Sequence, residues 1–179
     1  MNDSEGGLSR NLEWLNLLPT DEAKEELLQC CGSRAWARSM CESRPFATLD
    51  HLKSESSSIL RKLSRENWLE AFLSHPKIGE REAVHQTSQR AQSWSDDEQR
   101  ASVAKNDVDK QELRRLNQDY EDTFGFIFII CAAGKSSSEI LAALRRRLKN
   151  EKEKEIREAA AEQEKITELR LLKLLVDEK

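Results

Sequence analysis

The chain has 179 residues, long enough to bury a sizeable core within one domain. Hydrophobic residues make up 37% and charged residues 35%, and the 6 glycines and 3 prolines are too few for the many turns of a β protein, so we expect an all-α fold. The net charge of -4 excludes a global basic field, and nucleic acid is therefore not an expected partner.

Helices are indicated by apolar residues at helical spacing and by residues that commonly begin or end a helix. Thr20 has the character of an N-cap, because acidic residues follow it and suit the positive end of a helix. Ser136 and Glu139 have the spacing of a capping box. Four helices are predicted in the first half of the chain: Thr20 to a stop at Gly32, a helix with Trp36 and Met40 that stops at Pro45, Leu49 to Leu63, and Trp68 to Leu73. Three are predicted in the second half: Asp107 to Phe124, Ser136 to Leu144, and Glu151 to Leu175.

One apolar stretch does not fit this helical pattern. Phe126–Ile130 is a run of residues that favour strands, and the sequence offers no recognisable partner strand. We expect a buried extended segment or the start of a core helix, framed by Gly125 and Gly134. An extended segment would leave backbone N–H groups without helical partners, and such groups can face a ligand. The longest apolar run, residues 126–133, is far shorter than the ~20 residues of a membrane span, so no membrane association is expected.

The four cysteines, Cys30, Cys31, Cys41 and Cys131, have no metal-binding spacing and follow no secretory signal. We expect buried free thiols in a reducing, intracellular compartment and no metal site. The basic stretch Arg145–Lys149 is interpreted as the solvated end of a helix, where cations complement the helix dipole. A nucleic-acid patch is the alternative interpretation of that stretch.

His75 is the candidate catalytic residue. It is one of 3 histidines, and it precedes Pro76, which disfavours helical backbone at the residue before it. The imidazole should therefore lie at a rigid corner where a helix ends. A helix-end histidine satisfied by a carbonyl group is the other interpretation of this position.

Ser95 and Glu98 also permit two interpretations. Their spacing is that of a capping box, with Ser95 as the N-cap and Glu98 as the third helical residue. The same geometry would aim a hydroxyl and free backbone N–H groups at an anionic ligand, so a cap and a binding site are compatible. Arg170, in a charged helix, is equally consistent with a surface position.

The order of these motifs is more specific than any one of them. The sequence His75-Pro76-Lys77-Ile78-Gly79, then Ser95–Gln99, then Tyr120–Cys131, and finally Glu162–Arg170 after Asn150 resembles the decarboxylases of uric acid breakdown. That family acts on 2-oxo-4-hydroxy-4-carboxy-5-ureidoimidazoline (OHCU) and releases (S)-allantoin. The resemblance covers Cys30 to Leu175 and is strongest to the plant form, in which this domain is joined to a transthyretin-like hydroxyisourate hydrolase and the whole is called allantoin synthase.

The resemblance implies a helical bundle that needs no metal or organic cofactor, because a ring carbonyl of the substrate serves as the electron sink. The catalytic residues would be His75 and Glu98. The imidazole of His75 would be the proton donor or the acid–base group near the departing carboxylate, and Pro76 would fix its ring and contact the substrate.

The resemblance also implies a set of substrate-binding residues. Glu98 would accept hydrogen bonds from ureido or ring N–H groups, next to Ser95 and Gln99. Arg170 would bind carbonyl or carboxylate oxygens through its fixed fork of donors. The backbone of five consecutive residues would line the pocket: Phe128, Ile129, Ile130, Cys131 and Ala132.

We therefore expect residues 20–179 to form an OHCU decarboxylase domain, after an N-terminal extension at residues 1–19, and to form a homodimer as relatives do. A hydroxyisourate hydrolase domain would be fused or associated, and the location would be peroxisomal or cytoplasmic, although no targeting signal is visible in this sequence. One alternative is a helical interaction module without activity, which would bind a partner through the charged helix at residues 151–179. Another is a cofactor-free hydrolase that uses His75 and Glu98 and releases no carbon dioxide.

Overall fold

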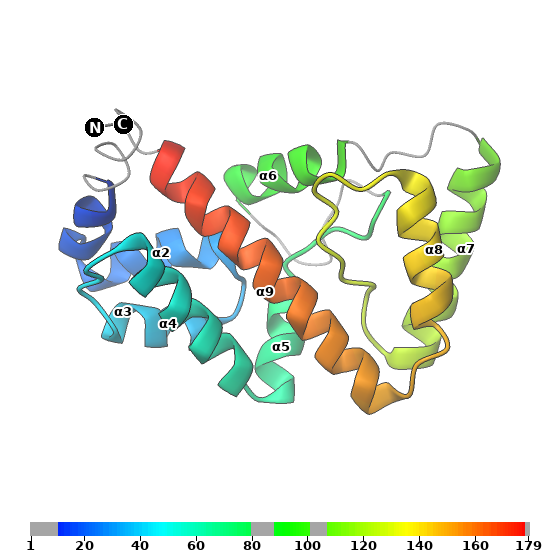
Figure 1. Ribbon diagram of the computed structural model, residues 1–179, viewed down its shortest axis with the longest axis horizontal. Helices are drawn as coiled ribbons and strands as arrows, with labels where there is room; N and C mark the ends of the chain where they lie inside the picture. Colours follow the sequence, from blue (N-terminus) through cyan, green and yellow to red (C-terminus); the bar gives the residue numbers. More distant parts are fainter. Residues whose placement is uncertain (1–10, 80–87, 101–106, 178–179) are drawn as a thin grey trace. The chain divides into compact units, whose positions relative to one another are not determined.

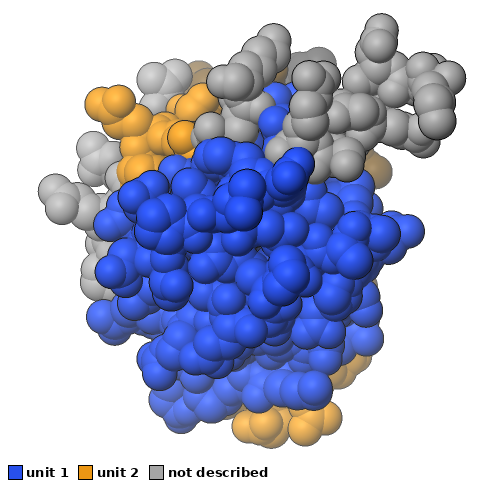
Figure 2. Space-filling model, turned by 90° about the vertical axis from the view of Figure 1, so that its left-hand side faces the viewer, with its two compact units in different colours: residues 1–70, 164–179 blue, residues 71–163 orange. Residues whose placement is uncertain are grey.

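The computed structural model describes residues 11–79, 88–100 and 107–177, and for these residues the prediction of an all-α fold is confirmed. Residues 1–10 of the predicted N-terminal extension lie outside the described ranges. The chain forms two compact units, one within residues 1–70 and 164–179 and the other within residues 71–163, which Figure 2 shows in different colours. None of the described helices combines the length and the apolar character that a membrane span requires.

The first unit is a set of packed helices around an apolar core. Its helices are α2 (Thr20–Cys30), α3 (Arg34–Glu42) and α4 (Leu49–Lys62), with most of α5 (Arg65–Phe72), the last part of α9 (Lys152–Asp177) and a helical stretch at residues 11–17. In Figure 1 they are drawn in blue to cyan, with the last part of α9 in red, and α3 contacts both α2 and α4. Side chains from every helix of this unit except α5 are fully buried, among them Leu15, Leu27, Trp36, Met40, Leu52, Leu171 and Leu174.

The ends of these helices show which local signals were correct. Ser33 and Thr48 are the N-caps of α3 and α4, and their side chains accept hydrogen bonds from Trp36 N and His51 N. The predicted cap at Thr20 is wrong, because Thr20 is already the first residue of α2 and Pro19 holds the cap position. Proline fixes its own φ angle and begins the turn without a side-chain hydrogen bond.

The second unit contains the end of α5, then α6 (Gln89–Gln99), α7 (Asp107–Phe124), α8 (Ser137–Arg147) and the first part of α9. Helices α7 and α8 pack side by side (Figure 1). The predicted bounds of α7 are confirmed, and so is the capping box at the start of α8, where Glu139 accepts a hydrogen bond from Ser136 N at 2.8 Å. All four cysteines of the chain are buried and free, as the sequence predicts.

The apolar stretch between α7 and α8 is not helical, so the expectation of a core helix there is wrong and the expectation of a buried non-helical segment is correct. Residues 126–132 are all buried. Gly125 and Gly134 flank them with φ angles of 78° and 75°, which glycine adopts without the strain of a side chain. The ring of Tyr120 anchors the segment, with its centroid 5.7 Å from that of Phe126 and 5.2 Å from that of Phe128.

The basic stretch at the end of α8 divides between the surface and the interior. Arg145 and Arg146 are exposed, as expected of a solvated helix end. Arg147 is only 1% exposed and forms a buried ion pair with Glu155, so the interpretation as a solvated end is wrong for this residue. The physical reason is helical spacing, since Arg147 continues the buried stripe of Ile140 and Leu144.

Candidate active site

His75 lies at a corner of the second unit, three residues after the end of α5 at Phe72. Its backbone N–H donates to Phe72 O at 3.1 Å, and its side chain is only 6% exposed. The imidazole Nε2 lies 2.8 Å from Oε1 of Gln163 on α9. Because an amide oxygen can only accept, Nε2 carries the proton in this contact. A side-chain amide therefore orients the ring of the candidate catalytic residue.

The corner that carries His75 is held by helices α6 and α7. Asn117 Nδ2 on α7 donates to Ile78 O at 3.0 Å, and Gly79 N donates to Gln99 Oε1 at the end of α6, also at 3.0 Å. Gly79 has a φ angle of 87°, and a Cβ atom added there would meet Leu113 at 2.9 Å. The positive φ angle favours glycine at this position, and a larger residue would also have to displace the Leu113 side chain. The prediction of a rigid corner after His75 is consistent with these contacts.

The interpretation of Ser95 and Glu98 as a capping box is wrong. Helix α6 already begins at Gln89, and its N-cap is Ser88, whose side chain accepts from Ala91 N at 3.1 Å. Ser95 lies inside the helix, is 3% exposed and donates its hydroxyl hydrogen to Ala91 O at 3.0 Å. A helix interior offers no free backbone N–H groups, so the anion site expected from a helix start does not form here.

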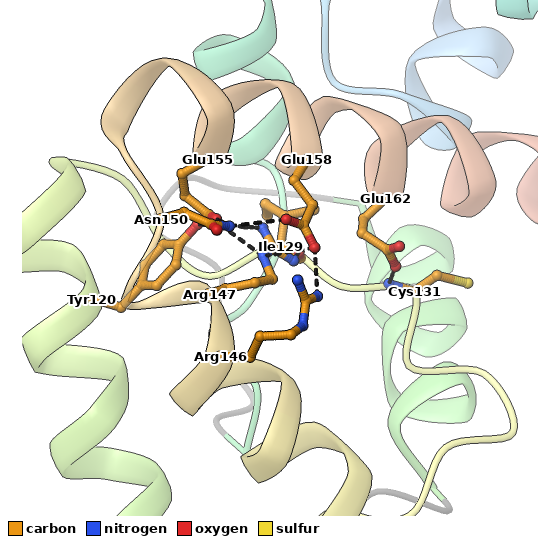
Figure 3. A network of polar contacts seen from close by, with 9 residues as sticks. All are labelled: Tyr120, Ile129, Cys131, Arg146, Arg147, Asn150, Glu155, Glu158 and Glu162. Atoms are coloured by element: carbon orange, nitrogen blue, oxygen red, sulfur yellow. Dashed lines mark hydrogen bonds and ion pairs between the residues drawn. The ribbon is translucent and has the colours of Figure 1, made fainter.

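Glu98 lies near the non-helical segment between α7 and α8. Burial raises the pKa of the Cys131 thiol, and the carboxylates of Glu162 and Glu98 raise this pKa further, while Lys135 lowers it. The backbone N–H of Cys131 donates to Glu162 Oε2 at 2.8 Å (Figure 3). The negative charges of Glu98 and Glu162 therefore both act on the side chain of Cys131.

The second unit contains most of the residues that the sequence predicts for a site. His75 contacts Gln163, whose neighbour Glu162 contacts Cys131, and the carboxylate of Glu98 influences Cys131 in turn. The other predicted members in this unit are Pro76, Ser95, Gln99, Phe128, Ile129, Ile130 and Ala132. All except the half-buried Gln99 are buried.

Arg170, unlike the other predicted site residues, belongs to the first unit. It lies on α9 and is only 2% exposed, so the surface interpretation of this residue is wrong. Burial raises the pKa of the Cys31 thiol to about 11, while a hydrogen bond from Thr167 and the positive charge of Arg170 act in the opposite direction. A guanidinium group is therefore held in a largely dry environment on the last part of α9.

Sequence reasoning missed Gln163, Glu162 and Asn117. The signal for Gln163 was available, because it follows Ile156 and Ala159 at helical spacing and is a polar residue on a buried stripe. Asn117 is likewise a buried amide between the apolar positions of α7. Among the described residues, no group of three or more His, Cys, Asp and Glu side chains is placed to hold a metal ion.

A buried imidazole, oriented by a side-chain amide within an all-α fold, defines the class of a candidate acid–base enzyme. The family model described as OHCU decarboxylase matches residues 16–172. The uric acid degradation bifunctional protein TTL of Arabidopsis thaliana is 36% identical over 154 residues, which are 86% of this chain and 48% of that protein. The 2-oxo-4-hydroxy-4-carboxy-5-ureidoimidazoline decarboxylase of Mus musculus is 30% identical over 139 residues, 78% of each chain.

Solved structures agree with these matches. A crystal structure of OHCU decarboxylase in the presence of (S)-allantoin is similar with a TM-score of 0.71 and 37% identity, and covers 85% of this chain and 98% of that one. A crystal structure of (S)-allantoin synthase shares the fold, with a TM-score of 0.68 and 22% identity over 91% of this chain and 53% of that one.

The chain belongs to the OHCU decarboxylase family. The sequence-based prediction of a lyase of uric acid degradation is thereby confirmed at the level of the family, and the helical interaction module is not supported. The chain spans 48% of the length of the Arabidopsis protein and 32% of that of PucL from Bacillus subtilis, both named as bifunctional proteins.

Proposed function

We propose that this chain decarboxylates OHCU and directs a proton to one face of the product, so that (S)-allantoin forms. The observation that carries the proposal is the buried imidazole of His75, oriented by Gln163 at 2.8 Å in a chain of the OHCU decarboxylase family. Cleavage of the bond between the ring carbon and the carboxylate releases carbon dioxide and leaves an electron pair beside a ring carbonyl. The carbonyl oxygen takes up this charge, and transfer of one proton to the ring carbon completes the reaction.

The roles of the individual residues belong to the same proposal. His75 would deliver the proton, and its buried, oriented ring supports delivery to a single face. Glu98 would accept hydrogen bonds from ureido or ring N–H groups, and its position beside Cys131 supports this role. Gln99 would hold the corner that carries His75, and Ser95 would lie behind Glu98 within α6. Arg170 would bind substrate oxygens with its guanidinium fork.

The proposal is tested by generating OHCU in place from urate with uricase and hydroxyisourate hydrolase, and following the circular dichroism of the allantoin formed. The wild type should give a strong single-handed signal, and His75→Gln should give only the slow racemic background. His51→Gln is the matched control, since His51 is an exposed histidine of α4. A racemic product with the wild type would refute the proposal. Consumption of OHCU without release of carbon dioxide, and therefore without formation of allantoin, would instead favour the hydrolase.

We also propose that the chain forms a homodimer and works with a hydroxyisourate hydrolase domain. The bifunctional names of the Arabidopsis and Bacillus subtilis relatives support a second domain. Light scattering coupled to size-exclusion chromatography tests the dimer, and a monomer at micromolar concentration would contradict it.

For the cellular location of the protein we propose the peroxisome or the cytoplasm. Imaging of the tagged protein together with a peroxisomal marker would decide between them.

A further inference from the structure

The segment at residues 126–132 raises a question of hydrogen bonding. It is buried and non-helical, and no strand accompanies it in the ranges 11–79, 88–100 and 107–177. Buried backbone N–H and C=O groups are nearly always paired in native proteins, most often with other backbone groups. Within the described residues, side chains supply hydrogen-bond partners to this segment.

Two charged side chains supply such partners at Ile129 and Cys131. Arg147 Nη1 on α8 donates to Ile129 O at 2.6 Å, and Glu162 Oε2 on α9 accepts from Cys131 N at 2.8 Å (Figure 3). In an extended chain, the C=O of one residue and the N–H of the residue two positions later point to the same edge. They are the pair of groups that a neighbouring parallel strand would bond. Arg147 and Glu162 therefore supply from side chains two hydrogen bonds of the kind that a neighbouring strand supplies in a sheet.

Arg147 is itself held in place from several directions. Its Nε donates to Glu155 Oε1 at 2.7 Å, and its guanidinium carbon lies 4.6 Å from the centre of the Phe128 ring. The hydroxyl of Tyr120 also donates to Glu155, as Figure 3 shows. Because Arg147 and Glu155 are 1% and 0% exposed, water does not compete for these contacts. The planar guanidinium can thus donate hydrogen bonds to Glu155 and to Ile129 O at the same time, with the angle between them fixed by the plane of the group.

We propose that Arg147 and Glu162 are positioning residues that fix the backbone at Ile129 and Cys131 and leave the N–H and C=O of Ile130, between them, to the substrate. An adjacent donor and acceptor match a ligand that presents an amide-like edge, such as the ureido group or the ring of OHCU. The inference rests on the proposed function, in which this backbone lines the pocket.

The first test compares three variants of α9 in the coupled decarboxylation assay. Glu162→Ala should lower kcat/KM by about ten-fold to a hundred-fold, because the Cys131 backbone loses its acceptor and moves. Glu162→Gln keeps a carbonyl acceptor and should stay within about three-fold of the wild type. Glu164→Ala is the matched control: it removes a carboxylate of similar burial two residues away, one that binds Ser57 and Arg61 instead. Wild-type kcat/KM in Glu162→Ala, or an equal loss in Glu164→Ala, would overturn the proposal.

The second test needs no substrate. Amide hydrogen exchange should accelerate by about ten-fold or more at Cys131 in Glu162→Ala and remain unchanged there in Glu164→Ala. Arg147→Lys keeps a cation for Glu155 but lacks the fork, so it should fold and show a lowered kcat/KM. If the wild type itself produced no single-handed allantoin, the proposed function would fail. The positioning role would then stand or fall on the exchange of Cys131 alone, and equal exchange in both glutamate variants would refute it.

Discussion

The Nε2 atom of His75 lies 2.8 Å from Oε1 of Gln163, and Glu162, the residue before Gln163, accepts a hydrogen bond from Cys131 N at 2.8 Å. Two consecutive residues of α9 therefore hold two different non-helical stretches of the same unit. Consecutive residues of a helix point in directions about 100° apart, since one turn contains about 3.6 residues. The imidazole and the backbone of Cys131 are thus bonded to neighbouring residues of a single helix, which is a stiff support.

The contact between Gln163 and His75 predicts a loss of turnover without a loss of fold. In Gln163→Leu the imidazole loses its acceptor and its fixed orientation, and we expect kcat to fall by about ten-fold or more. Gln118→Leu, which removes an exposed amide of α7 that pairs with Asp122, should leave kcat unchanged. Initial rates of single-handed allantoin formation measure the effect, and thermal unfolding checks that both variants are folded. Wild-type kcat in Gln163→Leu would show that the ring is oriented by other contacts.

The buried pair of Arg147 and Glu155 predicts a separation of stability from activity. Glu155→Ala leaves an uncompensated buried guanidinium and should lower the free energy of unfolding by about 3–5 kcal/mol, measured by urea unfolding. The double variant Arg147→Met/Glu155→Leu removes both charges and should recover most of that loss. Its activity should stay low, because Ile129 O has lost its donor. A double variant as unstable as Glu155→Ala would contradict the first expectation, and full activity would contradict the second.

The start of α6 predicts effects of unequal size for two serines. Ser88→Ala removes the N-cap acceptor for Ala91 N and should lower the free energy of unfolding by about 1 kcal/mol. Ser95→Ala removes a hydroxyl that donates to Ala91 O inside the helix, where alanine has the better helix propensity, and should destabilise the protein less. Urea titrations of the two variants give the comparison. A larger loss for Ser95→Ala would reverse this assignment of the helix start.

The thiol of Cys31 predicts a pH dependence of stability in the alkaline range. Burial raises its pKa from 9.0 to about 11 in the folded protein, so the neutral thiol favours folding. This contribution, about 3 kcal/mol, is fully present below pH 9 and is lost as the pH rises towards 11, where the folded protein must accept a thiolate. The wild type should therefore lose more stability than Cys31→Ala between pH 9 and 11 in urea unfolding. Parallel stability curves for the two proteins would exclude this role for Cys31.

Local sequence signals were sufficient for the fold and for part of the site. The bounds of α7 and the capping box of Ser136 follow from spacing within a few residues, and both are confirmed. The corner at His75 follows equally from the proline after it. Ser95 shows how a local signal fails, because Ser88 offers an equivalent cap about two helical turns earlier and the helix begins there.

The missed parts of the site depend on partners that are distant in the sequence. Gln163 meets His75 across 88 positions, and Arg147 meets Ile129 across 18. Gln163 and Arg147 are polar residues at positions where the helical spacing predicts buried apolar ones. This spacing shows that they are exceptional, but it cannot predict which group a buried polar side chain contacts. Assigning Arg147 to solvent was the natural inference from its basic neighbours, and its burial on the stripe of α8 decided otherwise.

The use of side chains in place of a strand changes which mutations the candidate pocket can tolerate. A strand in a sheet is bonded by main-chain atoms that every neighbour possesses, so its place survives most replacements next to it. The backbone at Ile129 and Cys131 is bonded instead by atoms that only particular residues carry, on helices α8 and α9. Exchange of Arg147 or Glu162 would erase a hydrogen bond that no relaxation of the main chain can restore. Natural variation in this chain should therefore be narrow at two positions that never need to touch a substrate.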